Sequence, residues 1–315
     1  MSSRSSDQNI YHGEIDQFIS EKYHVIAPIS KGGTSEIYKA VDNTRNSMVA
    51  IKILPLHFAG VNDQEEYEES VGKTLDIGHR IIDRSGEYII QEANFLINCH
   101  HPNIIRLCDY NLKGQRPYIV LDFIGNTTLK NQILNSRKRF SIKETLKILT
   151  HLCSALGYIH KKGFVYCDVK PSNVMSSRQK ITLIDFGLVR PIGMRVTGGT
   201  IGYMAPEILQ VNGDQVKASP TLDVYALGIV LYELITGFHP LASQKIYNAK
   251  NKYFFDRRLI TDKKSNPAPA SELNPLISKD FDEVLLQCVN KNPKERYQNT
   301  DDLLTDFEKE ARKLI

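Results

Sequence analysis

Residues 166–187 read YCDVKPSNVMSSRQKITLIDFG and bring two carboxylates, Asp168 and Asp185, close together in the sequence. Lys170 and Asn173 follow the first carboxylate, and the apolar run directly before the second is typical of a short, rigid strand. A carboxylate can accept the proton of a hydroxyl, and the oxygens of Asp and Asn are the hard ligands that Mg²⁺ prefers. The stretch therefore predicts chemistry in which a hydroxyl is positioned and metal ions hold phosphate oxygens.

Taken alone, either half of this stretch could be an ordinary surface turn, but D-x-K-x-x-N followed at this distance by D-F-G seldom arises by chance. The stretch resembles the catalytic loop and the magnesium motif of protein kinases. The resemblance implies that Asp168 is the catalytic base and that Lys170 offsets the charge of the transition state. It also implies that Asn173 and Asp185 bind Mg²⁺, with ATP as the phosphoryl donor.

Composition limits the classes of protein that the chain can form. The 315 residues are 41% hydrophobic and 24% charged, which is ordinary for a soluble globular protein. A net charge of +4 gives no support for nucleic-acid binding, which usually needs a far more basic surface. The N-terminus lacks an apolar signal segment, and the apolar stretch 224–235 is too short to span a bilayer. Five cysteines without a C-x-x-C pair fit reduced thiols in a cytoplasmic protein.

The N-terminal third reads as a leader at 1–20 followed by strands at 23–29, 36–41 and 47–54. The turn at 30–35, SKGGTS, stands where protein kinases have a glycine-rich hairpin over the nucleotide phosphates. The outer glycines of that hairpin are serines here, which restricts the freedom of the backbone. The resemblance assigns four residues of this hairpin to nucleotide binding, namely Ile29, Gly32, Gly33 and Ile37.

The third predicted strand carries the sequence V-A-I-K, in which Ala50 and Lys52 share one face. By resemblance, Lys52 holds the α- and β-phosphates of ATP and Ala50 lines the nucleotide pocket. The family pairs this lysine with a glutamate on the next helix, which is predicted at 88–98. Glu92 lies nine residues before an H-P-N-I-I segment, as in kinases, and is our choice for the partner, with Glu87 as the alternative.

Residues 55–85 form a longer connection than kinases usually have at this place, and they include an acidic cluster at 63–69. We interpret them as an inserted helix or loop beside the helix of Glu92. This insertion is our candidate site for a regulatory partner.

Two more strands, predicted at 106–110 and 117–122, complete a five-stranded sheet. The connector that follows resembles the kinase hinge. It implies that the Asp122 carbonyl and the Ile124 amide pair with adenine, and that Leu121 guards the pocket behind it.

From residue 125 onward the pattern becomes helical. A capping box, S-I-K-E, begins at Ser141, an apolar stripe follows it, and Gly163 ends the helix before the catalytic loop. Three further helices are predicted, at 224–235, 281–289 and 301–314.

An A-P-E sequence at 205–207 closes a short activation segment after D-F-G. By resemblance, Thr200 contacts the catalytic aspartate and lysine, and Asp223 bonds to the backbone of the catalytic loop. Arg296 matches the arginine that pairs with the glutamate of A-P-E, Glu207.

Motifs match in one order from Ile29 to Arg296, so the chain resembles Hanks-type serine/threonine protein kinases, bacterial members most of all. The implied fold is α+β and bilobal, with a β-rich N-lobe at 21–124 that has one main helix, and a helical C-lobe at 125–315. Lys170 and Thr200 are the residues that imply serine/threonine specificity. The implied reaction transfers the γ-phosphoryl group of ATP to Ser or Thr hydroxyls of protein substrates.

Two other classes of function stay open at this stage. A pseudokinase that binds nucleotide or a partner is suggested by the altered hairpin and by Tyr166 and Cys167, where the family has His and Arg. Against it, the residues that the family uses on phosphate and metal are all present. A kinase of small molecules is disfavoured because those enzymes usually lack A-P-E and the segment around Thr200.

Cys167 also bears on regulation. In many kinases the arginine at this position grips a phosphate on the activation segment, which a cysteine cannot do. Thr197 is the candidate phosphosite, and Arg190 and Arg195 lie on the segment itself, where they would anchor it less well. We therefore expect an activity that does not depend on phosphorylation of the segment, with control exerted instead at the 55–85 insertion.

Overall fold

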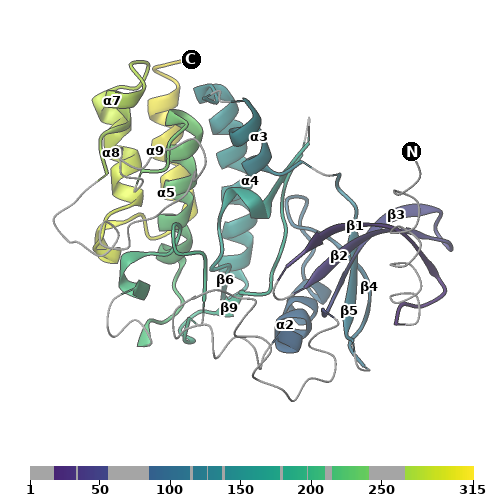
Figure 1. Cartoon of the computed structure of the whole chain (residues 1–315). Helices are drawn as coiled ribbons and strands as arrows, with labels where there is room; N and C mark the ends of the chain where they lie inside the picture. Colours follow the sequence, from purple (N-terminus) through teal and green to yellow (C-terminus); the bar gives the residue numbers. More distant parts are fainter. Residues whose placement is uncertain are drawn as a thin grey trace, which may run out of the picture. The chain divides into compact units, whose positions relative to one another are not determined.

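The protein is described by a computed structural model, in which the chain forms two compact units, Met1–His100 with Ile105–Ile124 and His101–Ile104 with Gly125–Ile315 (Figure 1). Several sequence predictions concern residues outside the described part, namely most of the leader, Gly33, Thr197 and residues 56–84 of the insertion. The structure describes residues 18–32, 35–55, 85–113, 116–125, 127–136, 139–177, 180–196, 198–209, 215–240 and 267–315.

The N-terminal unit is built on one antiparallel sheet of five strands in the order β1-β2-β3-β5-β4, which confirms the predicted sheet. One helix, α2 (Ser85–Ile97), contacts β4 and β5. The strands are β1 (Tyr23–Lys31), β2 (Glu36–Asp42), β3 (Ser47–Ile53), β4 (Leu107–Asn111) and β5 (Tyr118–Asp122).

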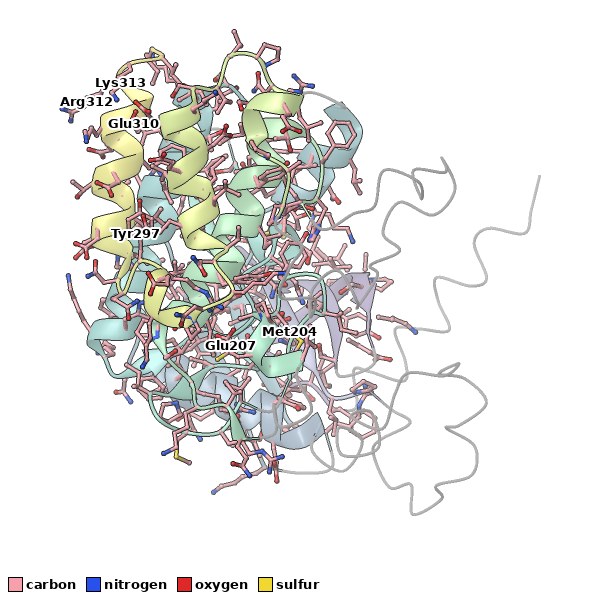
Figure 2. All side chains as sticks on the ribbon, turned by 90° about the vertical axis from the view of Figure 1, so that its left-hand side faces the viewer. Met204, Glu207, Tyr297, Glu310, Arg312 and Lys313 are labelled. Atoms are coloured by element: carbon pink, nitrogen blue, oxygen red, sulfur yellow. The ribbon has the colours of Figure 1, made fainter. Side chains whose placement is uncertain are left out.

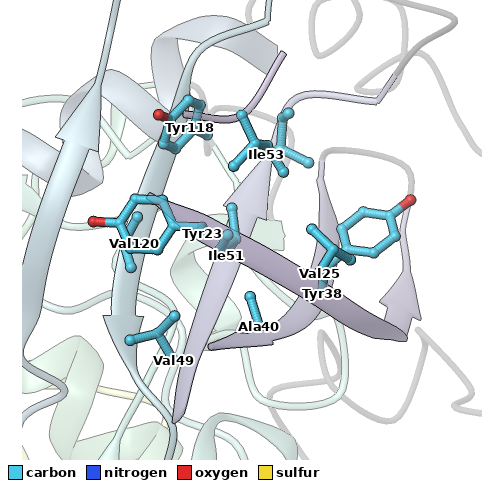
Figure 3. Packing of buried hydrophobic residues seen from close by; sticks show 10 residues of the cluster. Tyr23, Val25, Tyr38, Ala40, Val49, Ile51, Ile53, Tyr118 and Val120 are labelled. Carbon is cyan, nitrogen blue, oxygen red and sulfur yellow. The ribbon is translucent and has the colours of Figure 1, made fainter. Parts of the chain in front are cut away.

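Alternation along β3 sets the two faces of this sheet. Val49 and Ile51 are buried in a cluster with residues of β1, β2 and β5, among them Tyr38 and Val120 (Figure 3). Because side chains of a strand alternate between faces, burying these residues places Lys52 on the other face. The apolar cluster therefore orients the lysine that the sequence singles out.

The C-terminal unit is mostly helical, and with the sheet of the first unit it confirms the predicted α+β class (Figure 1). Helix α4 (Ile142–Lys161) begins with the predicted capping box, in which the Ser141 side chain accepts from the Glu144 amide and the Glu144 side chain accepts in return. Gly163 follows the helix with φ 82°. The other helices are α3 (Leu129–Ser136), α5 (Pro220–Thr236), α7 (Ala270–Leu273), α8 (Lys279–Cys288) and α9 (Thr300–Ala311).

Helix α5 is the centre of this unit, since every residue after its first is buried, and it packs against α4, α7 and α8. Two of its buried residues, Asp223 and Glu233, are acidic. A buried carboxylate costs several kcal/mol unless it is hydrogen-bonded, so both must find partners in neighbouring segments. None of the helices in the described ranges combines the length and apolar character that crossing a membrane requires.

Some element boundaries differ from the sequence prediction by a few residues. The strand expected at 23–29 continues because Ser30 and Lys31 still pair with β2, past two irregularities in the register. The helix expected at 224–235 begins earlier, at Pro220, because proline is favoured in the first turn, where its missing N–H costs nothing.

The connections between these helices contain short strands and 3₁₀ turns. Two-stranded ladders join β6 (Phe164–Val165) to β9 (Arg190–Pro191) and β7 (Val174–Ser176) to β8 (Ile181–Leu183). The 3₁₀ turns are Pro171–Asn173, Pro206–Leu209 and Pro293–Glu295.

A buried ion pair joins the A-P-E turn to the segment before α9, as predicted. Arg296 donates both Nη atoms to the Glu207 carboxylate, at 2.8 and 2.7 Å, and its Nε to the Asn290 carbonyl at 2.6 Å. The guanidinium also lies over the Tyr225 ring, 4.8 Å from its centroid. The Arg296 side chain is 0% exposed, so solvent does little to screen the pair.

We expect Arg296→Ala to lower the free energy of unfolding by about 3–5 kcal/mol. The substitution removes the cation that pairs with the Glu207 carboxylate, which is itself partly buried. The matched control is Arg312→Ala. Arg312 is 79% exposed and lies at the C-terminal end of α9 away from Glu207 (Figure 2), and within the described ranges its ion-pair partner is Glu308. The control should change stability by less than about 1 kcal/mol in urea unfolding. Equal melting curves for wild type and Arg296→Ala would contradict the energetic role of the pair.

Candidate active site

The carboxylate of Asp168 lies at the centre of a cluster of hydrogen-bond donors in the C-terminal unit. Its Oδ1 accepts from Thr200 Oγ1 at 2.9 Å, and its Oδ2 accepts from Lys170 Nζ at 2.6 Å and Asn173 Nδ2 at 2.8 Å. Lys170 Nζ also donates to Thr200 Oγ1 at 2.8 Å. The structure thus brings together four residues that lie up to 32 positions apart in the chain.

The electrostatics of this carboxylate suit a proton acceptor. Burial raises the pKa of Asp168 above its ordinary value, and Lys170 and the Thr200 hydroxyl oppose this rise. Asp168 is only 6% exposed, so its affinity for a proton is set by these neighbours more than by water. A carboxylate with a raised pKa holds an abstracted proton better, provided that it starts the reaction ionised.

The backbone of the loop that carries Asp168 is held by hydrogen bonds to Asp223, at the start of α5. The Asp223 carboxylate accepts from the amides of Tyr166 and Cys167, both at 2.8 Å, and from His160 Nε2 at 2.8 Å. Cys167 has φ 65°, a conformation that a residue with a side chain seldom adopts. The hydrogen bonds to Asp223 offset the free-energy cost of this backbone conformation. The conformation in turn directs Asp168, the next residue, toward its hydrogen-bond donors.

Asp185 follows β8 and also has a left-handed backbone, with φ 66°. The Ile184 amide donates to the Asn173 carbonyl at 3.0 Å, so the stretches that carry Asp185 and Asn173 are directly connected. Asn103, in the H-P-N segment, brackets β8 by donating to Ile181 O and accepting from Leu183 N, both at 2.8 Å.

Asn173 and Asp185 present the chemistry that a magnesium site needs. The Asn173 amide nitrogen is engaged with Asp168, which orients the amide oxygen as an acceptor, and Asp185 adds a carboxylate. Amide and carboxylate oxygens on adjoining backbone segments fit a hard cation such as Mg²⁺ better than a soft one.

Tyr166 turns out to be a structural link, although the sequence presented it only as a departure from the family pattern. Its buried hydroxyl donates to the carbonyl of Ile184, the residue before Asp185. Its ring meets the Phe186 ring edge-on, with centroids 5.1 Å apart. Tyr166 therefore ties the catalytic loop to the D-F-G turn.

In the N-terminal unit, Lys52 and Glu92 meet as the sequence predicted. Lys52 Nζ lies 2.6 Å from Glu92 Oε2, and the two side chains are 8% and 0% exposed. Glu87, the alternative partner, is exposed in the first turn of α2. Glu92 is therefore the glutamate that α2 presents to the lysine.

The other predicted nucleotide residues occupy the strands around Lys52. Ile37 is its register partner on β2, and Ala50 faces Leu121 on β5. The hairpin turn is closed by a bond from Gly32 N to Ser35 O at 2.9 Å. Three further predicted residues are Ile29, 42% exposed on β1, and Asp122 and Ile124, at and just after the end of β5.

Asp122 has a partner that the sequence did not indicate. Its carboxylate accepts two bonds from Arg106, at 3.0 Å from Nε and 2.7 Å from Nη2. This two-point contact bridges the start of β4 to the end of β5 and fixes the first residue of the connector.

The segment after Asp185 is held by backbone pairing in the described residues. β9 pairs with β6, and beyond it Gly193 N donates to Ala218 O at 2.9 Å while Ala218 N donates to Met194 O at 2.7 Å. Val196 N then donates to Val216 O at 3.0 Å. The segment is thus ordered by its own peptide groups as far as Val196, which is buried.

Glu233 is a site residue whose role the sequence analysis missed. It accepts a hydrogen bond from the Tyr203 hydroxyl at 2.9 Å, and burial raises its pKa to about 8. A signal was present, because Glu233 interrupts the apolar run 224–235, and a carboxylate in a buried helix is seldom placed there without a partner. It connects α5 to the segment between Thr200 and A-P-E.

Comparison with known proteins agrees with this geometry. Residues 23–307 match the family described as the protein kinase domain. A probable serine/threonine-protein kinase of Clostridium acetobutylicum is 28% identical over 300 residues, covering 93% of this chain and 40% of that protein. Serine/threonine-protein kinase PknB of Mycobacterium tuberculosis is 29% identical over 302 residues, covering 92% and 43%. The chain thus spans less than half the length of these relatives.

Proposed function

The chain belongs to the protein kinase domain family, and from this premise we propose that it transfers the γ-phosphoryl group of ATP to Ser or Thr hydroxyls of protein substrates. The observation that carries the proposal is the buried Asp168 carboxylate with Lys170 and Thr200 bound to it. A lysine and a hydroxyl that converge on one buried carboxylate can hold it ionised at the point where a proton is to be accepted. The names of the relatives support the same reaction.

In this proposal each residue of the cluster has one task. Asp168 receives the proton of the acceptor hydroxyl, and Lys170 stabilises negative charge that develops on the transferred group. Thr200 holds both of them in place through its hydroxyl. Asn173 and Asp185 would hold Mg²⁺, which when bound neutralises charge on the phosphate oxygens.

In the N-terminal unit, the pair of Lys52 with Glu92 is proposed to align the α- and β-phosphates. Glu92 keeps the ammonium group at one point, so that less entropy is lost when phosphate binds. The other proposed nucleotide contacts are Ile29, Gly32, Gly33, Ile37, Ala50, Leu121, Asp122 and Ile124.

The division into an N-lobe at 21–124 and a C-lobe at 125–315 belongs to the same proposal, as does a regulatory partner at residues 55–85. A cytoplasmic location rests on the cysteine pattern of the sequence.

The reaction is tested by following label from γ-labelled ATP with Mg²⁺ into a generic basic protein substrate. Asp168→Asn should lower turnover by roughly 10²–10⁴-fold, because a positioned acid–base group is lost. Asp301→Asn is the matched control, since Asp301 is exposed and pairs only loosely with Lys161 at 3.6 Å. An Asp168→Asn protein with half of wild-type turnover would overturn the assignment. A wild-type protein that binds nucleotide without transfer would instead indicate a pseudokinase.

We further propose that activity does not depend on phosphorylation of the activation segment. Cys167 cannot bind a phosphate, and burial raises the pKa of its thiol well above the ordinary value, so that it stays neutral. The backbone pairing of residues 190–196 with β6 and with 216–218 supplies order that a phosphate contact would otherwise provide.

Thr197→Ala, assayed on phosphatase-treated protein at saturating ATP, should therefore retain wild-type turnover. The comparison needs wild-type protein with and without phosphatase treatment as its control. A drop of tenfold or more, equivalent to about 1.4 kcal/mol of transition-state stabilisation, would show that phosphorylation of Thr197 matters.

A further inference from the structure

The segment from Thr200 to Glu207 is anchored at both ends and leads directly to the proposed base. At its start Thr200 bonds to Asp168, and at its end Glu207 pairs with Arg296. An acceptor hydroxyl that reaches Asp168 must therefore be presented alongside this segment. In its middle, the Tyr203 hydroxyl bonds to Glu233, and the Gly202 carbonyl is bound by a residue outside the segment.

His239 holds the middle of the segment. Its Nε2 lies 2.9 Å from the Gly202 carbonyl oxygen, and its ring meets the Tyr203 ring edge-on, with centroids 5.4 Å apart at 84°. Only 6% of His239 is exposed. One histidine thus fixes both the peptide group after Gly202 and the side chain of the next residue.

The end of α5 places His239 at this point. Gly237 ends the helix with φ 77°, which a residue without a Cβ adopts at little cost. Thr236 Oγ1 then donates to Tyr232 O at 2.7 Å and accepts from Phe238 N at 3.1 Å. The turn that carries His239 is therefore locked to the last turn of the helix.

The chemistry of the contact defines the state of the ring. A carbonyl oxygen can only accept, so Nε2 must carry a proton. Burial lowers the pKa of His239 to about 4, which leaves the ring neutral at neutral pH. A neutral ring can be buried against Tyr203 without a counter-charge, whereas a lysine or arginine donor could not.

We propose that His239 is a positioning residue for the protein substrate, acting through its hydrogen bond to the Gly202 carbonyl. This inference rests on the proposed function, because it concerns the segment along which the acceptor reaches Asp168. The Tyr203 hydroxyl bonds to Glu233, so the segment is fixed at two points, one on α5 and one on the turn that follows it. Loss of the His239 bond frees the Gly202 peptide group and misplaces the acceptor, while nucleotide binding is unaffected.

Two substitutions of His239 separate the effect of its hydrogen bond to Gly202 from the effect of its packing against Tyr203. His239→Phe keeps an aromatic ring against Tyr203 but has no N–H for the Gly202 carbonyl. His239→Gln loses the ring but keeps a neutral N–H donor of similar reach. His151→Phe is the matched control, because His151 also contacts a backbone carbonyl, that of Lys147, but is only partly buried on α4.

The experiment measures KM for a Ser/Thr peptide, KM for ATP, and amide hydrogen exchange over residues 198–209 in the full chain. For His239→Phe we expect KM for the peptide to rise about tenfold, since a buried carbonyl loses its donor. KM for ATP should stay within about twofold, and exchange near Gly202 should become faster. His239→Gln should recover most of both effects, and His151→Phe should match wild type.

An unchanged KM for the peptide in His239→Phe would overturn the inference. Equal impairment in the Phe and Gln variants would overturn it too, because restoring a neutral N–H donor to the Gly202 carbonyl would then not restore the position of the substrate. If wild type transfers no phosphate, the proposed function fails. Hydrogen exchange still decides whether His239 fixes the segment, since faster exchange in the Phe variant alone supports it and equal exchange in all variants refutes it.

Discussion

The buried carboxylate of Asp168 is the constraint on which the rest of the active site depends. An ionised carboxylate with 6% exposure is stable only if its oxygens keep accepting hydrogen bonds, and three donors at 2.6–2.9 Å provide them. These donors come from the catalytic loop, from its 3₁₀ turn and from the distant Thr200. Because each must arrive at the correct place, the requirement of one carboxylate fixes the course of three segments.

Helix α5 makes this arrangement rigid. A helix so apolar packs as the centre of its unit, and its two acidic residues are then available as internal anchors. Asp223 at its start holds the backbone of the catalytic loop, and Glu233 near its end holds Tyr203. The same helix therefore supports the proposed base and the segment beside it. A shift of either one relative to the other would require moving a buried helix within a packed core.

Sequence reasoning predicted the parts of this structure that have a local or spaced signal. Alternation along β3 predicted which face of the sheet Lys52 occupies, and the capping box predicted where α4 begins. The spacing between motifs predicted that Glu92, and not Glu87, is the partner of Lys52. It missed contacts between residues with no common motif, such as Tyr166 with Ile184 and His239 with Gly202, which are 18 and 37 positions apart. These contacts depend on how helices and turns meet in three dimensions. Strand ends were also misjudged, because pairing with β2 extends β1 beyond its own apolar pattern.

The central claim, that hydrogen-bond donors keep the buried Asp168 carboxylate ionised and ready to accept a proton, is tested most directly by the pH profile of kcat/KM. Thr200→Val removes one donor while preserving side-chain volume, and Thr200→Ser retains the hydroxyl. Losing a donor to the charged form raises the pKa of a carboxylate, so the acid limb should move to higher pH in the valine variant and stay in place in the serine variant. An acid limb at the same pH in all three proteins would contradict the account.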